Sequence, residues 1–140
     1  MVLTRVESEL PISLDRLFNY VSNLETMVEY NSSVKKAVWK ENTGSSKICS
    51  ITIVLSFLNF SGDYIVTEII QNQKIVARCN TGTLDFEDTY YFSGDDSKSK
   101  IIIEDRMNLK GLLSLSEGIL KPIMKTEMEA NLKTLITKLG

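Results

Sequence analysis

The feature that most constrains the fold is an amphipathic stripe at the end of the chain, after a long series of strand-like segments. Across residues 112–139, large apolar side chains recur three or four positions apart. This spacing is typical of one helix with a single apolar face. Its members are Leu113, Leu120, Met124, Met128, Leu132, Leu135 and Leu139. Because such a face has to be buried, we expect the helix to lie across a curved sheet and to enclose a hollow.

Gly118 and Pro122 interrupt this helix near its start. Proline lacks a backbone donor and clashes with the carbonyl four residues before it. We therefore expect either a kink at Pro122, or a short helix over 112–120 followed by a main helix that begins at residue 121 or 122.

The preceding residues predict one strand, two short helices and then five or six strands. Residues 2–10 alternate between apolar and polar side chains, which predicts a half-buried strand. Ser13 has the position of an N-cap for a short helix, and a second short helix is expected over 24–30. The later strands are expected at 34–41, 48–58, 64–70, 75–79, 83–92 and 100–109. Their short connections, including a turn at 59–63, predict antiparallel neighbours.

The last two strands allow a register to be predicted. A turn centred on Asp95 and Asp96 would pair Tyr90 with Ile101 and Asp88 with Ile103. One face then carries Leu84, Phe86, Tyr90, Phe92, Ile101, Ile103, Met107 and Leu109. The same register places Asp88 and Asp105 on this apolar face as diagonal neighbours.

Composition narrows the function classes. The chain has 140 residues, which predicts one domain over 1–140, and its net charge of −2 argues against non-specific binding to nucleic acid. No segment reaches the roughly 20 apolar residues of a membrane span, so no stable membrane insertion is predicted. No signal peptide is evident, and a cytoplasmic location is expected. With no histidine and no Cys/His cluster, neither a metal site nor a cofactor is predicted. Cys49 and Cys79 are expected to be buried free thiols.

The segments that carry a family resemblance are residues 10–21, Tyr30, the last hairpin (86–109) and the tail (118–136). In this order they resemble the helix-grip superfamily, which includes START lipid-transfer domains, the birch-pollen-allergen fold and polyketide cyclase/dehydrases. The resemblance covers essentially the whole chain. It implies an α+β fold in which an antiparallel, about seven-stranded curved sheet wraps around the C-terminal helix over an apolar cavity. It implies no single activity, because this fold hosts many functions.

A ligand cavity should be mainly apolar, with a few placed polar groups. The predicted ligand-binding residues are Met27, Tyr30, Phe57, Tyr64, Phe86, Tyr90, Met107, Leu113, Leu120, Met124 and Met128. The alternative is that these side chains pack together and leave no hollow.

Asp88, Asp105 and Tyr90 are the candidate catalytic residues. Two carboxylates close together in a low-dielectric space raise the pKa of one of them, so the pair would hold a proton or anchor a polar head group. The alternative is that a bulge turns one Asp outward, or that both lie at a wet strand end. Glu117 and Glu127, at the edge of the helix stripe, are expected to be solvated.

Three functions remain open from the sequence. The leading one is binding, with transport or sequestration, of a small hydrophobic or lipid-like ligand. The second is a polyketide cyclase/dehydrase-like enzyme that uses Asp88 or Asp105 with Tyr90 as proton carriers. The third is a module that binds a protein partner, which would need a filled interior and an exposed apolar patch.

Overall fold

A seven-stranded antiparallel sheet forms the body of the structure, a computed structural model that describes residues 1–140. The strands are β1 (Val2–Leu10), β2 (Val34–Asn42), β3 (Lys47–Leu55), β4 (Leu58–Ile70), β5 (Lys74–Asn80), β6 (Leu84–Gly94) and β7 (Ser99–Leu109). Their spatial order is β1-β7-β6-β5-β4-β3-β2. The first two strands therefore form opposite edges of the sheet, and the segment between them has to cross it.

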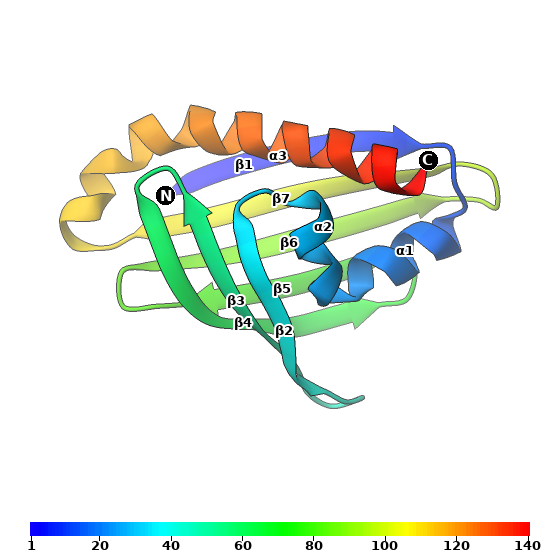
Figure 1. Ribbon diagram of the computed structural model, residues 1–140, viewed down its shortest axis with the longest axis horizontal. Helices are drawn as coiled ribbons and strands as arrows, with labels where there is room; N and C mark the ends of the chain where they lie inside the picture. Colours follow the sequence, from blue (N-terminus) through cyan, green and yellow to red (C-terminus); the bar gives the residue numbers. More distant parts are fainter.

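That crossing segment contains the short helices α1 (Leu14–Ser22), η1 (Leu24–Thr26) and α2 (Met27–Tyr30). The predicted N-cap is confirmed, because the Ser13 hydroxyl accepts a hydrogen bond from the Arg16 amide at 3.2 Å. Figure 1 shows α1 and α2 beside the concave side of the sheet, next to the strongly curved β2–β4 region. The α+β architecture predicted from the sequence is thereby confirmed.

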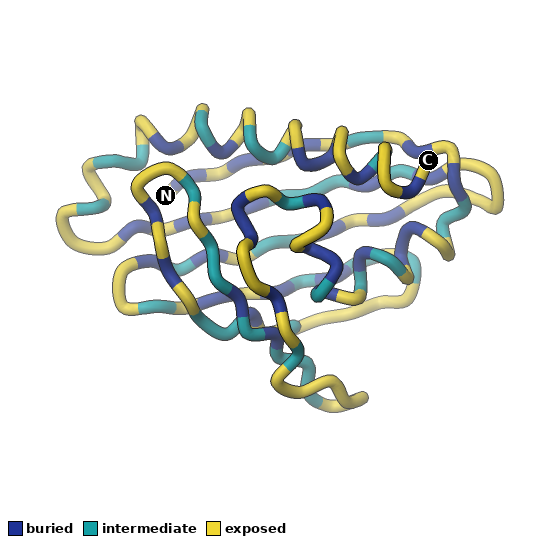
Figure 2. Tube along the Cα trace, viewed as in Figure 1, coloured by how far each residue is buried: buried dark blue, intermediate teal, exposed yellow.

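The C-terminal helix α3 (Glu117–Leu139) lies along β1, and its buried residues recur on the side that faces the sheet (Figure 2). The predicted stripe is buried at Leu120, Met124, Leu132, Leu135 and Leu139, whereas Met128 and Leu113 are half-buried. These residues join the strands and α1 in one apolar cluster. No helix of the structure is both long enough and apolar enough to cross a membrane.

The start of α3 differs from the prediction. Pro122 lies inside the helix, which already begins at Glu117, and the preceding turn is a 3₁₀-helix, η2 (Gly111–Ser116). The helix continues through the proline because this part of it is at the surface. Gly118, whose carbonyl would have bonded to residue 122, is exposed, so water can take the place of the missing donor.

The turn between β3 and β4 was predicted wrongly. It lies at Ser56 and Phe57, where Ser56 has a φ of 54°, and not at residues 59–63. Gly62, which suggested a turn, is instead paired within β4. A Cβ added there would come within 2.9 Å of the Cys79 thiol. The missing side chain of Gly62 therefore lets the Cys79 side chain lie close to the backbone of β4. Cys49 and Cys79 are both buried and unpaired, as predicted.

The β6–β7 register is shifted by two residues from the prediction. The loop spans four residues, and Gly94 pairs with Ser99. The carboxylate of Asp95 accepts the amides of Ser97 (2.9 Å) and Lys98 (3.0 Å), which stabilises the longer loop. Because side chains alternate with a period of two, the predicted faces survive this shift, but every cross-strand partner changes.

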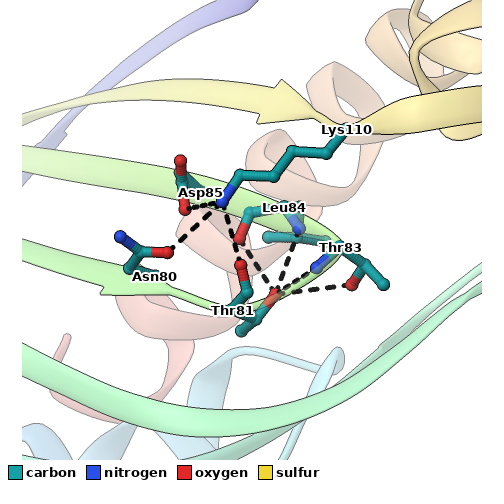
Figure 3. A network of polar contacts seen from close by, with 6 residues as sticks. All are labelled: Asn80, Thr81, Thr83, Leu84, Asp85 and Lys110. Atoms are coloured by element: carbon teal, nitrogen blue, oxygen red, sulfur yellow. Dashed lines mark hydrogen bonds and ion pairs between the residues drawn. The ribbon is translucent and has the colours of Figure 1, made fainter.

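The neighbouring β5–β6 turn is tied to the end of β7 (Figure 3). The Thr81 hydroxyl accepts the Leu84 amide at 3.1 Å and so closes the turn. Lys110, directly after β7, donates to the Thr81 carbonyl and forms an ion pair with Asp85, both at 3.1 Å. These contacts fix the end of β7, from which η2 leads into α3.

Candidate functional site

A cavity of about 100 Å³ lies between the inner face of the sheet and α3. This volume is of the same order as the ~150 Å³ of an engineered apolar cavity that holds benzene. Of the 18 lining residues, 12 are hydrophobic. They are Tyr30, Ile53, Leu55, Leu58, Phe60, Phe86, Tyr90, Ile103, Met107, Met124, Met128 and Leu132. The polar lining consists of Asn31, Ser33, Asp88, Asp105, Glu127 and Asn131.

The two aspartates lie in the middle of the apolar face because of strand alternation. Asp88 follows Phe86 by two residues in β6, and Asp105 precedes Met107 by two in β7, so all four side chains share one face. In the observed register Asp88 is directly opposite Asp105, not diagonal to it. Both aspartates line the cavity.

Each carboxyl of this pair changes the pKa of the other. Burial raises the pKa of Asp105 well above its ordinary value, and the charge of Asp88 raises it further. Burial also raises the pKa of Asp88, although hydrogen bonds from Asp105 and Tyr64 act in the opposite direction. Two buried carboxyls in contact do not both ionise near neutral pH. Asp105, whose pKa is raised the more strongly, therefore favours its protonated form beside Asp88.

Two tyrosines extend this pair into a hydrogen-bonded chain. The Tyr64 hydroxyl donates to Asp88 Oδ2 at 2.6 Å and lies 2.9 Å from the Tyr90 hydroxyl. Since Tyr64 gives its one proton to Asp88, Tyr90 must donate to the Tyr64 oxygen. Burial raises the pKa of both tyrosines well above the ordinary value, so both remain protonated donors. The chain thus runs from Tyr90 through Tyr64 to the Asp88 carboxylate.

Tyr64→Phe is expected to destabilise the fold by about 1–3 kcal/mol, because it removes a donor to a buried carboxylate and leaves Tyr90 without its acceptor. The free energy of unfolding in urea measures this loss. Tyr91→Phe is the matched control, since Tyr91 is exposed on the other face of β6, and it should change stability by less than about 0.5 kcal/mol. Equal effects of the two substitutions would contradict the chain of hydrogen bonds.

A second polar group joins α3 to the α2–β2 loop. Glu127 accepts hydrogen bonds from the hydroxyls of Ser33, at 2.8 Å, and Ser32. Asn131 Oδ1 accepts the Ser32 amide at 3.2 Å. The prediction that Glu127 is simply solvated is therefore wrong, because Glu127 is half-buried and lines the cavity. Glu117 is also engaged, accepting the chain's amino terminus at 2.7 Å and the amide of Leu109.

The structure brings part of the predicted ligand-binding set together around the cavity. On its wall are Tyr30, Phe86, Tyr90, Met107, Met124 and Met128. Buried in the same apolar core, but not lining the cavity, are Met27, Tyr64 and Leu120. Leu113 is half-buried in η2 and does not reach the wall. Phe57 was placed wrongly, because the early β3–β4 turn leaves its side chain 46% exposed.

Sequence reasoning missed the cavity wall formed by β3 and β4, namely Ile53, Leu55, Leu58 and Phe60. Phe60 was assigned to a turn, and with the correct turn its alternation with Leu58 would have pointed to the inner face. Asn31, Ser33 and Asn131 were also missed. No pattern in the sequence signals them, since their role depends on where α3 meets the α2–β2 loop.

No protein-family model and no curated protein matches the chain by sequence. Solved structures do match by shape. TTHA0849 from Thermus thermophilus has a TM-score of 0.84 at 16% identity, with 98% of this chain and 96% of that chain covered. A START superfamily protein from Mycobacterium smegmatis has a TM-score of 0.82 at 12% identity, with the same coverages.

A third match is the Zhui aromatase/cyclase from Streptomyces sp. R1128, with a TM-score of 0.75 at 5% identity, covering 98% of this chain and 90% of that chain. At such low identities the likeness establishes the fold alone. The chain has the helix-grip fold, as its sequence predicted.

Proposed function

We propose that this protein binds a small, mainly apolar ligand in the cavity between the sheet and α3, either to carry it or to sequester it. The observation that carries the proposal is the cavity itself, which is mostly hydrophobic yet has two carboxyl groups on one wall, Asp88 and Asp105. Binding would be driven by removal of apolar ligand surface from water, at about 25 cal/mol per Å². The polar groups would set the orientation of the ligand.

The fold is consistent with this proposal. Structural neighbours are described as a START superfamily protein and as an aromatase/cyclase, and those descriptions concern those proteins. In this chain, support comes from the arrangement of its own residues. Phe86 and Met107 on the sheet face Met124 and Met128 on α3 across the cavity. Methionine side chains are flexible and adapt to ligands of varied shape.

The methionines also provide the test. Of the five in the chain, Met107, Met124 and Met128 line the cavity, whereas Met1 and Met27 do not. With ¹³C-labelled methionine methyl groups, titration with toluene should shift the three cavity signals saturably and leave Met1 unchanged. Absence of any saturable shift, or equal shifts of all five signals, would refute the proposal. Native mass spectrometry of protein from its own cells would then identify the retained molecule.

A second candidate, acid–base catalysis on a bound ligand, is favoured by the hydrogen-bonded chain from Tyr90 to Asp88. A protonated Asp105 beside an ionised Asp88 provides an acid and a base on one cavity wall. In this case Asp105→Asn should abolish turnover of a polyketide-like substrate without loss of binding. Recovery of that substrate unchanged after incubation with the unmodified protein would argue for a binding protein instead.

A protein-partner function is favoured by the three most exposed large apolar residues, Leu112, Leu115 and Ile119, around the start of α3. A protein-partner module would need an interior filled by side chains, whereas this structure has a cavity under α3. Purification of a stable complex with a second protein, with the cavity free of ligand, would support it over the proposed function.

A further inference from the structure

All the charged residues that line the cavity are acidic. Three of the lining residues are acidic, Asp88, Asp105 and Glu127, and none is a lysine or an arginine. The chain contains no histidine. Arg106, directly after Asp105, and Arg78, on the neighbouring strand β5, are both exposed, on the opposite side of their strands from the buried residues beside them. The cavity therefore contains no positive group that balances its acids.

The geometry points to a ligand that bears a positively charged amine: we propose that the cavity selects small hydrophobic amines and excludes hydrophobic carboxylates. This inference rests on the proposed ligand binding and specifies the chemical class of the ligand. The ammonium group would lie against Asp88 and Asp105, with the apolar part of the ligand among the methionines and aromatic rings.

The first support is an acceptor without a donor. Asp105 is only 7% exposed, and its Oδ1 has no hydrogen-bond donor from another residue. Buried polar atoms are normally satisfied, and an exception on a cavity wall points to a missing partner. An ammonium group offers three donors, enough to reach the carboxyl pair from the cavity side.

The second support is charge. The two acidic side chains face the cavity without a counter-ion, and even a pair that holds one proton carries a net charge of −1. The hydrogen-bond donor to Asp88, the Tyr64 hydroxyl, is neutral, and neither aspartate takes part in an ion pair. A buried charge without a counter-ion is strongly unfavourable, so a cationic ligand would relieve the penalty and an anionic ligand would increase it. Glu127 adds negative potential where α3 meets the α2–β2 loop, which would also attract a cation.

Four one-ring compounds of similar size separate these effects near neutral pH: benzylamine, benzyl alcohol, toluene and benzoate. Affinities come from the shifts of the labelled methyl groups of Met107, Met124 and Met128. Benzylamine should bind at least about tenfold more tightly than benzoate, with the two neutral compounds between them. Benzoate binding as tightly as benzylamine would overturn the inference but leave the proposed function intact, provided toluene binds. If none of the four binds, both fail.

A double variant, Asp88→Asn with Asp105→Asn, keeps the shape of the pair and removes its charge. We expect its ratio of benzylamine to toluene affinity to fall by about tenfold or more. Glu87→Gln is the matched control, because Glu87 is exposed and adjacent to Asp88 in sequence. If the double variant does not fold, Asp88→Asn combined with Glu127→Gln removes the charge of the Asp88 carboxylate and of the second acid on the wall. An unchanged amine preference in a folded variant would contradict the assignment.

Discussion

Met124→Trp is expected to abolish uptake of one-ring ligands while the fold remains intact. Met124 is 4% exposed and extends from α3 into a cavity of only about 100 Å³, so a larger indole side chain would occupy the space that a ligand needs. Toluene affinity, followed by the methyl signals of Met107 and Met128, should fall at least about 100-fold. Phe86→Trp, from the opposite wall, should have the same effect.

The control for this result is Ile119→Trp on the same helix. Ile119 is 66% exposed, so its replacement should leave toluene binding unchanged. Overpacking at position 124 should destabilise the fold by about 1–3 kcal/mol, which urea unfolding would measure separately from ligand affinity. Toluene binding by folded Met124→Trp with the affinity of the unmodified protein would show that the ligand site lies elsewhere.

Asp105→Asn is expected to change how stability depends on pH. In the folded protein the pKa of Asp105 is raised, above all by burial and also by the charge of Asp88. Above the pKa of the unfolded chain, near 3.8, the folded state therefore binds more protons than the unfolded state. The unmodified protein should lose stability as pH rises through this window until Asp105 ionises in the folded state. An asparagine, which mimics the protonated acid by donating to Asp88, removes this loss.

The measurement is the free energy of unfolding in urea at several pH values, for both proteins. Relative to Asp105→Asn, the unmodified protein should lose up to about 1.4 kcal/mol per pH unit within this window. Asp96→Asn, in the exposed β6–β7 loop, provides the control and should run parallel to the unmodified protein. Parallel curves for Asp105→Asn as well would show that Asp105 titrates normally and that no proton is shared with Asp88.

The order of elements and the faces of the strands could be predicted because they depend on local periodicity. Alternation in β6 and β7 put Phe86, Tyr90 and Met107 on the inner face, whatever the loop between the strands. The same periodicity does not distinguish registers that differ by two residues. The Asp95 carboxylate selects the observed register, because it accepts two backbone amides and so stabilises the longer loop. Counting turn residues in the sequence does not reveal these hydrogen bonds.

The candidate site was less accessible to sequence reasoning, because it depends on contacts between distant segments. Asp88 and Asp105 were identified as a pair, but their direct opposition followed only from the correct register. Tyr64 was predicted to line the cavity, whereas it lies behind the wall and links Tyr90 to Asp88. Glu127 was considered solvated because nothing in the sequence shows that Ser33 will approach it from the α2–β2 loop.

The most direct test of the account is a crystal structure of the protein under xenon pressure, since xenon occupies empty apolar cavities. We predict xenon density between the sheet and α3, in contact with Phe86, Met107 and Met124. A structure in which side chains fill this space, with no xenon beneath α3, would contradict the proposed ligand binding and the amine selectivity derived from it.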